Sequence, residues 1–237
     1  MAGESAAGPA SVTTRLSLPA RAWNLLCRAV RVELRIYESL WRAIAHRPRI
    51  AEHARGFRYH RPVLTVFIIF IVLSAVEIPI VDAIVHRWPP IRISFLIIGI
   101  WGLTWMIGVL CAYLTRPHTV GSEGIRVREG LELDIPVSWN DLASIRMHTT
   151  SSDPNDPKNK PKRVFEEDGE RICAIRIGNE TNLEIAFERP TILRLPGLPP
   201  KGGPHEVTRL RFWADDPHGV LDDARRQLDG AASSSER

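Results

Sequence analysis

Long apolar runs occupy one part of the chain, between residues 62 and 115. The first, over residues 63–76, contains no charged residue and follows Pro62, which suits the first turn of a helix. The second, over residues 93–114, has neither a charged residue nor a polar face. About 20 apolar residues in a helix cross the hydrocarbon core of a bilayer. The pattern therefore predicts two transmembrane helices, over about residues 63–82 and 93–114.

Residues 20–46 follow a different pattern, in which polar and apolar positions alternate with a helical period. The apolar residues recur at spacings of three and four and form one stripe: Trp23, Leu26, Val30, Leu34, Tyr37, Trp41 and Ile44. Four arginines follow one flank of this stripe: Arg28, Arg31, Arg35 and Arg42. The pattern predicts a basic amphipathic helix that suits the headgroup region of an anionic leaflet. A second patch of Leu25, Val32 and Ile36 on the opposite side equally favours packing against a partner helix or self-association, and both alternatives stay open.

After residue 116 the chain changes to short alternating segments separated by turn residues, which predicts a β-rich region. The expected strands cover residues 125–129, 131–137, 142–148, 172–178, 182–187 and 206–214. The first two of them form an expected hairpin, and a polar loop at 153–163 interrupts the series. Asp215 and Asp216 before Pro217 predict the start of a last helix, because Asp caps a helix and Pro suits its first turn.

Charge is divided unevenly along the chain and indicates an orientation. Residues 1–61 carry 11 arginines and 4 acidic residues, residues 62–115 carry 2 of each sign, and residues 116–237 carry 18 basic and 21 acidic residues. Arginines crowd both outer flanks of the two apolar runs, and few cations lie in the loop between them. The positive-inside rule then places both termini in the cytoplasm. The basic charge belongs to this membrane edge, so we expect no nucleic-acid binding.

Ionisable residues near the end of the first run raise a hypothesis of ion transport. Glu77, Asp82 and His86 would share roughly one side of a continuous helix, as a relay of ions or protons does. Pro79 is expected to disrupt that helix, which favours a hydrated loop end. Small residues in the second run would allow close helix packing: Gly99, Gly102, Gly108 and Ala112.

Motifs that carry chemistry are missing from the sequence. There is no nucleophile elbow, phosphate-binding glycine loop, zinc-binding HExxH or dinucleotide fingerprint. Cys27, Cys111 and Cys173 are too far apart for a CxxC site or a disulfide scaffold. Asp153 to Pro157 superficially resembles a calcium loop, but its prolines and its missing Gly and Glu argue against one. We therefore expect no catalytic residue, no cofactor and no metal.

One resemblance to a known family is carried by the predicted hairpin. The segment GIRVREGLELDIPVSWNDLASIR, followed by further strands and a helix opened by DDP, resembles a bacterial pleckstrin-homology-like (PH-like) domain. Ile135, Trp139, Leu142 and Ile145 occupy the positions that carry the likeness. Over about residues 62–230, two spans ahead of such a domain are similar to two-span membrane proteins of actinobacteria. The resemblance implies a curved antiparallel barrel or sandwich with one helix, used for binding rather than catalysis.

The expected fold class combines membrane α-helices with a β-rich, PH-like barrel or sandwich. Its parts are a disordered lead-in (1–19), a basic helical arm (20–61), a transmembrane hairpin (62–115), a cytoplasmic domain (116–230) and a disordered tail (231–237). The expected function is non-enzymatic: a multi-pass protein of the cell membrane whose domain mediates contact with a protein partner, a second copy or lipid. Anionic phospholipid would meet the arginine-rich arm. The alternative is a small transport or channel component that uses Glu77 and Asp82 near the outer interface.

Overall fold

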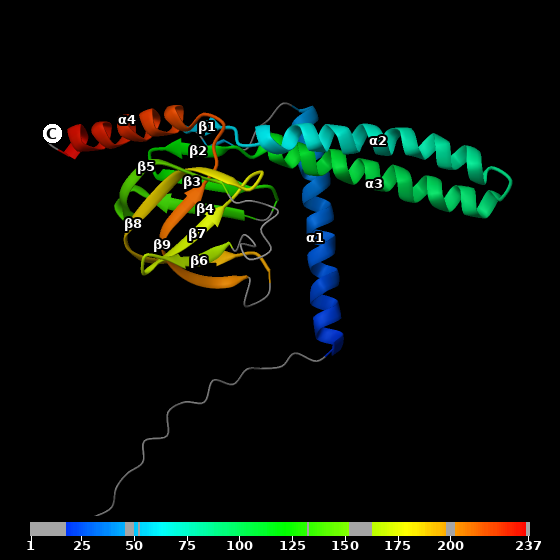
Figure 1. The fold of residues 1–237 in the computed structure, drawn as a ribbon, viewed down its shortest axis with the longest axis horizontal. Coiled ribbons are helices and arrows are strands. Elements are labelled where there is room, and N and C mark those ends of the chain that lie inside the picture. Colours follow the sequence, from blue (N-terminus) through cyan, green and yellow to red (C-terminus); the bar gives the residue numbers. More distant parts are fainter. Residues whose placement is uncertain are drawn as a thin grey trace, which may run out of the picture.

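The structure is a computed structural model of the chain, and it describes residues 18–45, 50–51, 53–131, 133–151, 163–197 and 202–235. The expected disordered lead-in falls almost wholly outside these residues, as does most of the polar loop at 153–163. The described chain forms a hairpin of two long helices, a third helix that crosses the hairpin, and a β region at one end of it (Figure 1).

Three helices confirm the apolar patterns of the first half of the chain. α1 covers Leu18–Ile44, α2 covers Arg61–Val85 and α3 covers Pro89–Thr115. At 1.5 Å per residue, the 25 residues of α2 and the 27 of α3 extend for about 37 and 40 Å. No side chain of α2 is buried, and those buried on α3 lie near its C-terminal end. Both helices are long and apolar enough to span a membrane.

The β region consists of two sheets. The first sheet has the order β1-β2-β3-β4, and the second has the order β5-β8-β9-β7-β6. The strands of the first sheet are β1 (Arg55–Phe57), β2 (His118–Gly121), β3 (Gly124–Glu129) and β4 (Leu133–Ser138). Those of the second are β5 (Leu142–Ser151), β6 (Val164–Glu167), β7 (Glu170–Ile175), β8 (Glu180–Leu195) and β9 (Gly203–Phe212).

The topology confirms the β3–β4 hairpin and corrects one other expectation. β3 and β4 pair antiparallel from Gly124↔Ser138 to Glu129↔Leu133. β7 and β9 pair in parallel, so the expectation of a purely antiparallel fold is wrong. In the chain, β8 lies between β7 and β9. It pairs antiparallel with β9 on the edge of β9 that faces away from β7, and β9 therefore runs in the same direction as β7.

The two sheets pack face to face and do not close into a barrel within the described residues. The chain leaves the first sheet through a short 3-10 turn, η1 (Trp139–Asp141), and β5 then pairs with β8 rather than with β4. One continuous core lies between the sheets, built from alternating side chains such as Val127 and Ile135 on one side and Leu183 and Leu210 on the other. The barrel-or-sandwich expectation thus resolves to two packed sheets.

The helical hairpin is inserted between two neighbouring strands of the first sheet. β1 precedes α2, β2 follows α3, and the two strands pair antiparallel with Phe57 opposite His118. Residues that the sequence assigns to the arm therefore contribute a strand and a fully buried side chain, Tyr59, to the β region. The base of the hairpin is fixed by sheet hydrogen bonds and is not a free linker.

The last helix, α4 (Pro217–Ser235), begins where the sequence predicts. Asp216 accepts a hydrogen bond from the backbone N–H of Gly219 at 2.9 Å, as expected of a capping residue. Val220, Leu221 and Ala224 of α4 are buried in the core of the β region. The helix contacts β1 and β2 and extends away from the hairpin, in the direction opposite to α2 and α3 (Figure 1).

Candidate functional site

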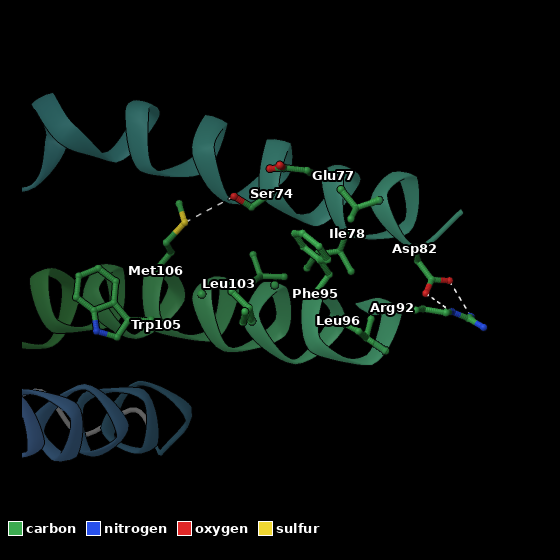
Figure 2. Close-up of a pocket in the computed structure, with 14 residues that line it drawn as sticks. Ser74, Glu77, Ile78, Asp82, Arg92, Phe95, Leu96, Leu103, Trp105 and Met106 are labelled. Atoms are coloured by element: carbon green, nitrogen blue, oxygen red, sulfur yellow. Dashed lines mark hydrogen bonds and ion pairs between the residues drawn. The ribbon is translucent and has the colours of Figure 1, made fainter. Parts of the chain in front are cut away.

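The sequence-predicted ionisable residues lie at the end of the hairpin away from the β region, which we call the far end. A crevice of about 460 Å³ runs along the α2–α3 contact, lined mostly by apolar side chains (Figure 2). Asp82 of α2 and Arg92 of α3 point toward one another there and form a two-bond ion pair of 2.5 and 2.9 Å. This pair ties the two helices together across the loop.

The structure does not bring Glu77, Asp82 and His86 into one cluster. The ring of His86 hydrogen-bonds through Nδ1 to the carbonyl of Ala83, and Glu77 lines the crevice apart from the Asp82–Arg92 pair.

The expected disruption of the helix at Pro79 is wrong, since α2 continues through this residue to Val85. Proline removes a single backbone hydrogen bond, and α3 packs along the same segment of α2.

α1 is seated on α3 through a close contact at Gly108. Ile36 is fully buried, and a Cβ added at Gly108 would lie 2.2 Å from its Cγ2 atom. Two hydrogen bonds flank this contact: the indole N–H of Trp101 donates to Glu33 at 2.9 Å, and Arg35 donates to the carbonyl of Leu131 at 3.2 Å. Ile36, from the smaller apolar patch of α1, thus packs within the chain, on α3.

These contacts fix how α1 is rotated about its own axis. Around the helix, Arg35 faces the β3–β4 turn, Ile36 faces Gly108, and Glu33 faces Trp101. Trp101 lies seven residues before Gly108, about 10 Å nearer the far end of the hairpin. At 100° per residue the apolar stripe lies beyond Glu33, on the side facing the far end, and the arginine flank faces the β region.

The seven side chains of the stripe are exposed at the surface of the described chain. They are exposed by between 43% (Tyr37) and 71% (Trp41). α1 runs across the hairpin near the end that meets the β region (Figure 1). The stripe is therefore a long apolar surface on a helix that crosses the hairpin, and it faces the far end of the hairpin.

An aromatic cluster joins both long helices to the β region, and we call it the base cluster. Its members are Tyr59, Phe67, Tyr113, His118 and Phe212. Tyr59 stacks on His118 with ring centroids 4.5 Å apart, and Tyr113 contacts Tyr59 at 5.8 Å and Phe67 at 5.7 Å. The Tyr59 hydroxyl accepts a hydrogen bond from the N–H of Gly130 at 2.9 Å.

His118 is the polar centre of the base cluster. Its Nδ1 accepts the backbone N–H of Arg128 at 3.0 Å, so the proton resides on Nε2, which donates to the carbonyl of Trp213 at 2.9 Å. Burial lowers the pKa of His118 to about 4, which the hydrogen bond to Trp213 only partly offsets. At neutral pH the ring is uncharged, and it holds β2, β3 and the end of β9 together.

A buried carboxylate, Glu184, organises one face of the second sheet. It accepts hydrogen bonds from Arg146 (2.6 Å), Arg211 (2.7 Å) and Arg209 (3.1 Å). Burial opposes its ionisation, but the hydrogen bonds from Arg211 and Arg146 outweigh burial and lower the pKa of Glu184 to about 2. Arg211 and Arg209 also contact Glu167 and Glu170, which makes this cluster an internally neutralised network.

The described part of the chain shows no candidate metal site. It contains no group of three or more His, Cys, Asp or Glu side chains placed to hold a metal ion, and all three cysteines are free.

Comparison with known proteins returns no matching family model, no matching curated protein and no matching solved structure. Any functional conclusion therefore depends on the geometry of the chain itself.

Proposed function

We propose that this chain is an integral membrane protein that crosses the cell membrane twice and holds its β region against the cytoplasmic surface. The β region, PH-like in its strand pattern, serves protein assembly or lipid contact without enzymatic activity. Protein partners, a second copy of the chain or anionic phospholipid are the candidates for what it contacts. The positive-inside distribution of arginine supports cytoplasmic termini.

The rotation of α1 carries this proposal. If α2 and α3 cross the bilayer, α1 lies in the plane of the leaflet nearest the β region. Its exposed stripe then faces the hydrocarbon, with Trp23 and Trp41 among the side chains that enter it, and its arginines face the headgroups and the β region. An in-plane helix explains why a stripe of seven large apolar side chains is exposed at the surface of the described chain.

Site-directed spin labelling of the full chain in lipid nanodiscs tests the proposal. A label at Val30, in the stripe, should be accessible to oxygen, which partitions into lipid, and protected from a water-soluble nickel chelate. A label at Arg35, on the opposite flank, should show the reverse because that residue faces the β region. Each label is placed as a single cysteine in a background without the three native cysteines.

Two other results would count against the proposal. A Val30 label that is accessible to the nickel chelate places the stripe in water and contradicts the in-plane position. A Val30 label shielded from both reagents places a protein partner on the stripe. Ion transport through Glu77 and Asp82 stays an alternative prediction. No contact in the described chain joins these two side chains, so no observation of the structure favours it over the main proposal.

A further inference from the structure

A basic cleft opens at the base of the hairpin, where β1 leads into α2. Its volume is about 600 Å³, and three arginines line it: Arg55, Arg58 and Arg61. Leu64, in the first turn of α2, forms its wall on the side of the membrane-length helix. The cleft thus has a cationic part next to the β region and an apolar part that continues onto the surface of α2.

The arginines of the cleft keep their charge available. Within the described chain, Arg58 and Arg61 form no ion pair, and the guanidinium of Arg55 lies 5.7 Å from the centre of the Phe57 ring. Two aspartates also line the cleft and reduce its positive charge without cancelling it, and Asp215 accepts the indole N–H of Trp213 at 3.2 Å. Asp215 accepts the N–H of Arg61 at 3.2 Å, and Asp216 accepts the N–H of Gly219 at 2.9 Å.

A buried histidine in the same cleft has one ring nitrogen without a hydrogen-bond partner in the described chain. His60 is only 6% exposed and lines the cleft, and its Nδ1 atom makes no hydrogen bond in the described chain. An unpaired buried nitrogen costs free energy that a ligand or water can recover. The three arginines that line the same cleft form a surface that suits a phosphate group, because arginine matches phosphate oxygens in charge and geometry.

We propose that this cleft binds the phosphate of an anionic phospholipid in the leaflet next to the β region. The arginines hold the headgroup, and the acyl chains follow Leu64 and the exposed face of α2. This continuity from cationic to apolar surface favours a lipid over a free phosphate. The inference rests on the proposed function, since it requires α2 to cross the bilayer, and it names the lipid class that this function uses.

The test measures lipid retention by the full chain in mild detergent, with native mass spectrometry as the readout. The protein is offered phosphatidylglycerol and phosphatidylcholine with identical acyl chains. Arg58→Gln/Arg61→Gln should weaken retention of phosphatidylglycerol by roughly 30-fold, since each arginine near an anionic surface contributes about fivefold. The matched control, Arg189→Gln/Arg194→Gln on β8, removes the same charge from exposed positions outside the cleft and should retain the lipid as the wild type does.

Three outcomes overturn the proposal. Equal retention of both lipids by the wild type removes the headgroup preference, and equal loss in both double variants reduces it to net charge. Inorganic phosphate that displaces the lipid at equal concentration reassigns the cleft to a soluble phosphate. The spin-label result separates this proposal from the proposed function: a stripe in lipid without selective retention refutes the cleft alone, whereas a stripe in water refutes the membrane arrangement itself.

Discussion

His118 and Tyr59 show how two side chains couple the membrane-length helices to the β region. Tyr59 precedes α2 by two residues, and His118 follows α3 by three. Their rings stack, and each makes its hydrogen bonds with backbone groups of the β region. A neutral His118 is required for this arrangement, because its Nδ1 must be free to accept the N–H of Arg128.

Acidification should weaken this junction. The pKa of His118 falls from 6.5 in the unfolded chain to about 4 in the folded one, chiefly because burial disfavours the imidazolium ion. The unfolded chain therefore binds the proton first as the pH falls, and stability is lost between about pH 6.5 and pH 4, by up to about 3 kcal/mol. The thermal midpoint of the detergent-solubilised protein, followed by tryptophan fluorescence, measures this loss.

Histidine variants assign the pH dependence to this ring. His118→Gln should lower the midpoint at pH 7 and flatten its decline toward pH 4. His218→Gln, at an exposed position on α4, should leave the decline as steep as in the wild type. An equally steep decline in both variants would attribute the acid sensitivity to other groups.

Buried polar residues are one part of the structure that the sequence did not predict. The alternation around Glu184 places it on a face opposite the apolar residues Leu183 and Ile185, which is typical of a solvated side chain. Its burial arises because arginines from two other strands, β5 and β9, cover it. Pairing between distant strands decides such burial, and alternation within a single strand does not contain that information.

Among the elements, α1 shows how far a helical pattern can be interpreted. Its period predicted both the helix and its two apolar faces, and the structure confirms the helix over Leu18–Ile44. The sequence could not decide which face packs on protein, because both are apolar. The decision is made on α3, where Gly108 leaves space for Ile36, and the larger stripe is left exposed.

Filling the space at Gly108 should unseat α1. In Gly108→Ala the new methyl group would lie 2.2 Å from Cγ2 of Ile36, and a β-branched side chain in a helix has little rotamer freedom with which to move aside. The distance between spin labels at Arg31 on α1 and Ser144 on β5 should therefore become longer and more broadly distributed. Pulsed electron paramagnetic resonance of the labelled protein measures that distance.

Two variants show whether the effect is steric. Gly102→Ala lies on the same helix, and its new methyl group would meet no atom within 4 Å, so the distance should not change. Ile36→Ala/Gly108→Ala removes the clashing Cγ2 atom and should restore most of the wild-type distribution. A shift in Gly102→Ala, or no rescue in the double variant, would mean that α1 is not seated by this contact.

At the scale of the whole molecule, the hairpin is an insertion in the sandwich. The apolar pattern separated the chain into arm, hairpin and β region, and the helices and the β3–β4 hairpin agree with that division. β1 was missed because a three-residue strand has no alternation to detect. It is recognisable only through its pairing with β2, across the 60 residues between Phe57 and His118.

This insertion predicts that the β region folds without its membrane helices, provided that β1 is kept. Replacing residues 62–115 with a short Gly/Ser linker joins the neighbouring ends of β1 and β2. Residues 50–235 of this chimera should be soluble and give a dispersed amide NMR spectrum.

The fragment 116–235 lacks the buried Phe57 and Tyr59 and the Asp215 contacts to Arg58 and Arg61. Removing a large buried side chain costs about 3–5 kcal/mol, so this fragment should unfold at a much lower urea concentration. Tyr59→Ser in the chimera should reproduce part of that loss, whereas Arg58→Gln, at an exposed position, should not. If the fragment 116–235 were as stable as the chimera, the segment before the hairpin would contribute nothing to the stability of the β region. The hairpin would then not be an insertion within the folded sandwich.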